Sequence, residues 1–186
     1  MVALSALWLP IIVAAVIVFF ASFVMHMLLK YHNSDYHQIP DEDKVLATLR
    51  EAGVKPMLYV FPYGTHETMK SPEMQEKYKR GPVGTMTIRP SGPIAMGKFL
   101  GQWFVFCLVI GFFTAYVCAH TLAAGTDYLQ VFRVAGTVAF MSYGLGNLAN
   151  GIWKGQPWGM TIKEVVDGLV YGLLTAGTFG WLWPKM

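Results

Sequence analysis

The chain has 186 residues, of which 54% are hydrophobic and only 13% charged, and its mean hydropathy is +0.43. A soluble domain usually carries about 25% charged residues, so this composition is typical of a membrane protein. The net charge of +3 is small and comes from mixed signs, which argues against nucleic acid as a partner. The charge is also local, because ten of the 14 Lys and Arg residues and eight of the 11 Asp and Glu residues lie between Lys30 and Lys98.

Four apolar stretches predict four transmembrane helices. The first, from Leu4 to Leu29, carries no charge and exceeds the roughly 20 residues that a span needs. A cleaved signal peptide would begin with a basic region, but no lysine or arginine precedes Lys30, so we expect an uncleaved first span. The predicted helices cover about residues 4–29, 99–120, 130–152 and 162–183. The sequence therefore predicts an all-α integral membrane fold, a four-transmembrane-helix bundle.

Residues 30–98 are predicted to form an ordered cap of short helices and extended segments between the first and second membrane helices. Residues 41–52 have an acidic first turn and a glycine after the last turn, as a short helix should. Ser71 and Pro72 are suited to start a second helix, which Gly81 would end. The extended segments are expected within residues 57–63 and 83–89.

Basic residues in the connections predict the orientation. The insert at 30–98 holds ten, and Lys154 and Lys163 lie between the third and fourth helices. The connection between the second and third helices has none before Arg133. Because basic connections stay in the cytoplasm, residues 30–98 are predicted to be cytoplasmic and both termini outside, with the bacterial inner membrane as the expected location.

Small residues recur at every fourth position of the last helix. They are Gly168, Gly172, Ala176 and Gly180. Residues four apart share one helical face, so these four predict a groove into which another helix packs closely. The sequence leaves open whether that helix belongs to this chain or to a partner.

A polar cluster is predicted around Asp167, an acidic residue well inside the fourth span. Asn147 and Asn150 of the third span and His26 of the first are expected at a similar depth. One interpretation is a proton relay, an ion site or a polar substrate pocket. The favoured interpretation is a structural polar knot, or Asp167 reaching toward the interface beside Lys163.

Histidines suggest cofactors only weakly. His26 and His120 are predicted near opposite membrane faces, so they cannot clamp one haem between them, and single-histidine ligation of haem or chlorophyll is what remains. His32, Asp35 and His37 are residue types that suit a divalent metal, but their spacing matches no metal motif. We therefore predict a solvated interfacial loop and no metal site. Motifs of hydrolases, nucleotide-binding enzymes and redox enzymes are missing, so an enzyme is not predicted.

Three features resemble bacterial four-helix membrane proteins of unknown function. They are an apolar first span that ends in an aromatic–histidine segment, the stretch GPVGTMTIRPSGPIAMGKFLGQWF, and KEVVDGLVYGLL at the start of the last span. The resemblance implies a membrane bundle but supplies no activity.

These observations favour a non-catalytic accessory or scaffold subunit of a larger membrane protein complex, such as a bioenergetic one. Its expected partners are membrane lipids and either other integral membrane subunits or copies of itself, with bound lipid and no other cofactor. A small oligomeric transporter or channel that uses the Asp167 cluster is the alternative. A pigment- or haem-binding subunit is the third interpretation.

Overall fold

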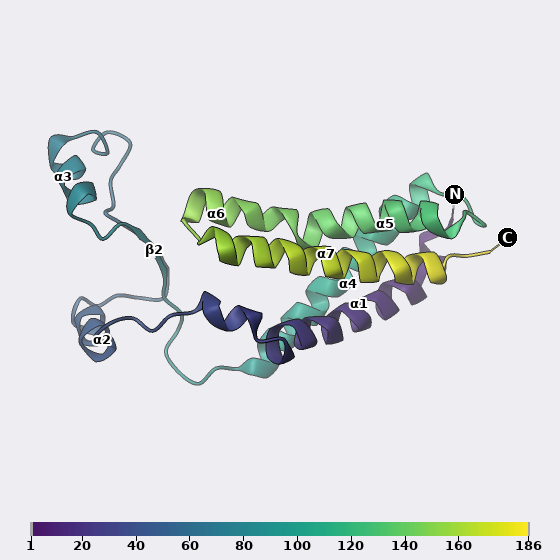
Figure 1. The fold of residues 1–186 in the computed structure, drawn as a ribbon, viewed down its shortest axis with the longest axis horizontal. Coiled ribbons are helices and arrows are strands. Elements are labelled where there is room, and N and C mark those ends of the chain that lie inside the picture. The colour runs from purple at the N-terminus through teal and green to yellow at the C-terminus, as the bar shows by residue number, and fades with distance from the viewer. Residues whose placement is uncertain (1, 186) are drawn as a thin grey trace. The chain divides into compact units, whose positions relative to one another are not determined.

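The computed structural model describes residues 2–185, which are mostly helical (Figure 1). In chain order the elements are the 3₁₀ turn η1 (Leu4–Leu7), α1 (Trp8–Phe23), the π-helical turn η2 (Val24–Leu28), the 3₁₀ turn η3 (Tyr31–Asp35), α2 (Glu42–Glu51), β1 (Leu58–Phe61), α3 (Pro72–Arg80), β2 (Gly84–Thr87), α4 (Met96–Thr121), α5 (Tyr128–Tyr143), η4 (Leu145–Asn147), α6 (Leu148–Lys154) and α7 (Trp158–Trp181). The chain divides into two compact units. The helical unit takes in the residues up to Tyr36, Ala95–Gly151 and the chain from Gln156 onward, and the insert unit comprises His37–Ile94 with Ile152–Gly155.

Within residues 2–185, two helices are long and apolar enough to cross a membrane. One is the continuous helical stretch Leu4–Leu28, and the other is α4. The other two predicted spans differ from these in length or charge. α5 has only 16 residues, fewer than the roughly 20 that a span needs, and α7 has 24 residues but carries Lys163, Glu164 and Asp167 in its first half. Two candidate spans are therefore established, and the remaining two stay a prediction.

Consecutive long helices of the helical unit run in alternate directions. The Val2 N–H donates to the Ala119 carbonyl, which joins the start of the first helix to the end of α4. The Gly125 N–H donates to the Pro184 carbonyl, which joins the start of α5 to the residues after α7. Both ends of the described chain therefore lie at one end of the helical unit, in the up-and-down arrangement of a simple bundle.

The small residues of α7 pack against α5 of the same chain. A Cβ atom added to a glycine on either helix would come very close to the other helix. A Cβ on Gly168 would lie 2.3 Å from the Gly144 Cα, and one on Gly172 would lie 3.0 Å from the Phe140 N. A Cβ on Gly180 would lie 2.7 Å from the Tyr128 ring. On the facing helix, a Cβ on Gly136 would lie 3.0 Å from the Ala176 Cβ. The two helices run side by side along this contact (Figure 1). The partner of the predicted groove is thus a helix of this chain.

The third predicted helix is interrupted. Residues 130–152 were expected as one helix, but α5 ends at Tyr143, and η4 separates it from α6. The interruption begins at Gly144, which has φ −105° and ψ −61° and meets α7 at the closest contact of the pair. Glycine holds a helix weakly, so the position that allows this approach is also the one where the helix breaks.

The insert unit contains the short elements predicted for it. β1 and β2 pair antiparallel, with Leu58 opposite Thr87 and Phe61 opposite Gly84. The Ser71 side chain caps α3 by accepting a hydrogen bond from the Met74 N–H, as predicted from the sequence. Met74 is the only hydrophobic residue of His37–Ile94 that is buried. This unit consequently leaves nearly all of its apolar side chains at least partly exposed.

Candidate functional site

Six polar side chains meet at the end of the helical unit opposite the termini. We call them the Asp167 cluster: His26, Tyr31, His32, Asp35, Lys163 and Asp167. His26 comes from η2, the next three from η3, and the last two from α7. The cluster lies within the helical unit, and it joins segments about 130 residues apart in sequence.

The local backbone explains why η3 turns back toward α7. The α-helix α1 widens into the π-helical turn η2, a rare form that occurs often at functional sites. Lys30 then adopts φ 48° and ψ 0°, in the left-handed region that residues other than glycine seldom occupy. This residue ends the helix and starts η3, so that His32 and Asp35 share a face one turn apart.

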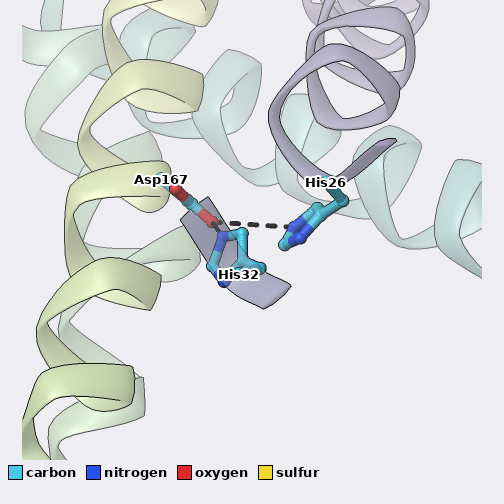
Figure 2. A group of neighbouring side chains, drawn as sticks. All are labelled: His26, His32 and Asp167. Atoms are coloured by element: carbon cyan, nitrogen blue, oxygen red, sulfur yellow. Dashed lines mark hydrogen bonds and ion pairs between the residues drawn. The ribbon is translucent and has the colours of Figure 1, made fainter. Parts of the chain in front are cut away.

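Asp167 is the centre of the cluster and is only 3% exposed. Its Oδ1 accepts a hydrogen bond from the Tyr31 hydroxyl. Its Oδ2 lies 2.8 Å from His32 Nε2 and 3.6 Å from His26 Nε2. Figure 2 shows the two imidazoles and the carboxylate pointing toward one another. A buried carboxylate is costly unless it is paired, and here three side chains pair with it.

His32 bridges two carboxylates. Its Nε2 faces Asp167, and its Nδ1 lies 2.7 Å from Asp35 Oδ2. Lys163 fixes the far side of this bridge, because its Nζ donates to Asp35 Oδ1 at 2.5 Å, to the Tyr31 carbonyl at 2.7 Å and to Ser34 Oγ at 2.8 Å. α7 therefore holds η3 at two points one helical turn apart, and the imidazole ring between them has little freedom to rotate.

The ionisation of two members follows from these contacts. The hydrogen bond from Lys163, aided by the one to His32, holds the pKa of the Asp35 carboxyl below its usual range. Burial, together with the hydrogen bond to Asp167, raises the pKa of the Tyr31 hydroxyl above its ordinary value. Asp35 is therefore a carboxylate at neutral pH, and Tyr31 is a protonated donor.

Three members of the cluster could hold a metal ion. His26, His32 and Asp167 each offer one ligand atom, and these atoms all lie within 4.8 Å of one another. Ligands of a tetrahedral ion with bonds of about 2.1 Å stand about 3.4 Å apart. The His26–Asp167 distance of 3.6 Å fits this spacing, and the His32–Asp167 distance of 2.8 Å would have to widen by roughly half an ångström.

The structure brings together only some of the residues predicted from sequence. His26 and Asp167 meet, as the predicted polar cluster requires. The Asn147 side chain instead donates to the Tyr143 carbonyl, and the Asn150 carbonyl accepts from the Gln156 N–H. Within residues 2–185, no hydrogen bond links either asparagine to Asp167.

Of the three residues that suit a metal by type, His32, Asp35 and His37, only two lie in the site. His32 and Asp35 belong to the Asp167 cluster, whereas His37 belongs to the insert unit. His120 lies in the last turn of α4, where its Nδ1 is 2.7 Å from the Tyr116 carbonyl, and so at the end opposite His26. Sequence analysis missed Tyr31 and gave Lys163 no anchoring role. The available signal was the four-residue spacing of Lys163 and Asp167, which places both on one face of α7.

The candidate site has to be interpreted from its own geometry. No protein-family model, curated protein or solved structure matches the chain.

Proposed function

We propose that this chain is an integral membrane protein that binds a divalent transition metal ion through His26, His32 and Asp167. The observation that carries the proposal is the convergence of two imidazole nitrogens and one carboxylate oxygen within 4.8 Å. A second feature supports it. Histidine ligands usually donate their other ring nitrogen to a carboxylate or carbonyl, and Asp35 lies 2.7 Å from His32 Nδ1. That contact leaves Nε2 of His32 for the metal.

The ligand set indicates which ions fit. Two imidazoles and one carboxylate suit zinc and ferrous iron, and the set contains no thiolate that would favour softer ions. Three protein ligands leave at least one coordination position open, as in metal sites that bind or activate a small molecule. The site is thus built for chemistry or for ligand binding more than for holding the fold, whose hydrophobic core lies among α1, α4, α5 and α7.

Metal titration of the purified full chain in detergent tests the proposal. Cobalt(II) serves as the probe because it develops visible absorption bands in a tetrahedral site, and zinc should displace it. We expect about one ion per chain, with binding lost in His32→Ala and retained in His37→Ala. Absence of binding at micromolar cobalt, or equal binding by His32→Ala, would overturn the proposal. The cluster would then be a hydrogen-bonded network that holds η3 against α7.

The proposed membrane topology has four spans. α7, and α5 together with α6, complete the bundle, the insert unit is cytoplasmic and both termini are outside. Support comes from the two apolar spans, the shared position of the chain ends and the basic residues of the insert. Cys107 and Cys118 are buried, so cysteines introduced at exposed positions can be labelled selectively. An impermeant thiol reagent should label Lys185→Cys from outside intact cells and spare Glu67→Cys; labelling of Glu67→Cys would refute the orientation.

A second candidate function is that of a subunit in a larger membrane complex. The insert unit favours it, because side chains such as Leu58 and Val60 are 58% and 50% exposed and Met74 is the only buried hydrophobic residue of His37–Ile94. A photoreactive amino acid at Leu58 should cross-link to one membrane protein in native cells, while the same group at Glu67 should not. Equal, diffuse cross-linking at both positions would remove this candidate.

A further inference from the structure

An apolar groove runs along the surface between α1 and α4, next to the Asp167 cluster. Its first part has a volume of about 440 Å³ and is lined by Phe19, Phe20, Ser22, Phe23, His26, Met27, Leu100 and Trp103. A second hollow of about 320 Å³ shares Phe19, Phe20 and Leu100 with the first and continues past Val16, Gly101 and Phe104. From His26 to Val16 the groove follows ten residues of helix, or about 15 Å.

The groove has one polar end. Ser22 and Trp103 contribute polar atoms to its wall, but these are already paired: the Trp103 Nε1–H donates to Ser22 Oγ at 2.8 Å, and the Ser22 hydroxyl donates to the Phe19 carbonyl at 2.7 Å. His26 is different, because its Nε2 faces Asp167 while its Nδ1 makes no hydrogen bond to any residue of 2–185. Its side chain is 47% exposed and lines the groove, so the imidazole ring is accessible to a ligand.

From this geometry we infer that the groove binds a lipid-soluble quinone or its quinol, with the ring at His26 and the tail toward Val16. Four aromatic side chains surround the wider part, and aromatic rings stack favourably on a flat ring. An imidazole nitrogen can donate to a ring carbonyl or accept from a ring hydroxyl. Neither hollow is lined by a lysine or arginine, which a phosphate or carboxylate head group would require. The head group is therefore neutral.

This inference does not depend on the metal proposal. The groove is built from α1, η2 and α4, and only His26 belongs to both sites. If the metal is also present, the bound ring lies beside the ion, since His26 contacts both. Loss of one site by mutation of a residue other than His26 should leave the other measurable.

Gly101 allows the groove to be filled without disturbing the fold. A Cβ added to Gly101 meets no atom within 4 Å, and the residue lines the second hollow. Gly97 lies one turn earlier on α4, also has nothing within 4 Å, and does not line either hollow. Gly101→Leu should block the tail of a ligand, and Gly97→Leu is the matched control.

The experiment titrates the purified full chain in lipid nanodiscs with a decyl-substituted benzoquinone and follows quenching of tryptophan fluorescence. We expect saturable binding that Gly101→Leu weakens at least tenfold and Gly97→Leu leaves within twofold. Cobalt binding by Gly101→Leu should stay normal, which separates this result from a failure of the metal proposal. Quenching that does not saturate, equal affinity in Gly101→Leu, or equally effective competition by a fatty acid of the same chain length would overturn the inference and leave ordinary membrane lipid as the occupant.

Discussion

Gly168 of α7 lies against Gly144 of α5 so closely that a Cβ added to Gly168 would come within 2.3 Å of the Gly144 Cα. Real Cβ atoms never approach a backbone atom this closely, and neither backbone can move without separating the helices. This contact fixes the depth at which α7 packs, and Asp167 is the residue immediately before it. The position of the Asp167 carboxylate in the site therefore depends on Gly168, which has no functional group of its own.

Substitution of the α7 glycines should destabilise the fold in the order of these contacts. Gly168→Ala places a methyl group against backbone, and overpacking of this kind costs about 3 kcal/mol. That corresponds to a fall in apparent melting temperature of roughly 6–12 °C in detergent. Gly172→Ala, where the nearest atom is 3.0 Å away, should cost less. Gly159→Ala is the control because nothing lies within 4 Å, and a Gly168→Ala protein as stable as Gly159→Ala would contradict the packing.

Asp35 should tune the metal site without touching the ion. Asp35→Asn replaces the carboxylate that orients His32, and loss of such a partner typically weakens metal affinity by about 10–100-fold. The expected result is a correspondingly higher cobalt dissociation constant in competition with a chromophoric chelator. Asp43→Asn, an exposed change in α2, serves as the control. Affinity that is the same in both variants would show that His32 needs no carboxylate partner.

Removal of the Tyr171 hydroxyl should not destabilise the protein. Its hydroxyl is buried and has no hydrogen-bond partner among the described residues. An unsatisfied buried polar group costs about 1–3 kcal/mol, so Tyr171→Phe should keep or raise the melting temperature. Tyr31→Phe removes a hydroxyl that donates a hydrogen bond to Asp167, so this substitution should lower the melting temperature. A clear loss of stability in Tyr171→Phe would mean that its hydroxyl has a bonding role.

Sequence periodicity predicted the elements whose cause is local. The apolar stretch from Leu4, the Ser71 cap and the small-residue face of α7 each follow from residue type and spacing within one segment. The break at Gly144 was not predictable in this way, because glycines also occur inside helices. It depends on the approach of Gly168, which lies 24 residues away and on another helix.

The site was only half predictable for the same reason. Depth in the membrane predicted that His26 meets Asp167, and the two residues do meet. The same argument placed Asn147 and Asn150 beside Asp167, but the Asn147 side chain bonds the Tyr143 carbonyl instead. Depth gives no rotation about a helix axis, so it cannot choose among residues at one level. His32 joined the site because Lys30 reverses the chain through a left-handed conformation, which no composition or periodicity signals for a lysine.

The last prediction separates the structural and chemical roles of Asp167. Asp167→Asn keeps the size of the side chain, and its amide can still accept from the Tyr31 hydroxyl and donate to His32 Nε2. Asp167→Leu leaves both partners facing an apolar group in a buried site, where each polar group left without a partner costs about 1–3 kcal/mol. In metal-free protein, the melting temperature of Asp167→Asn should stay near that of the unmodified chain while that of Asp167→Leu falls well below it. Both variants should lose cobalt binding, because a carboxamide is a poor metal ligand and leucine offers no ligand atom.

If Asp167→Asn instead binds cobalt normally, the carboxylate is not a ligand and acts only as a hydrogen-bond acceptor for Tyr31 and His32. If Asp167→Asn loses cobalt binding and also abolishes an ion flux in proteoliposomes, the result supports the transporter interpretation directly.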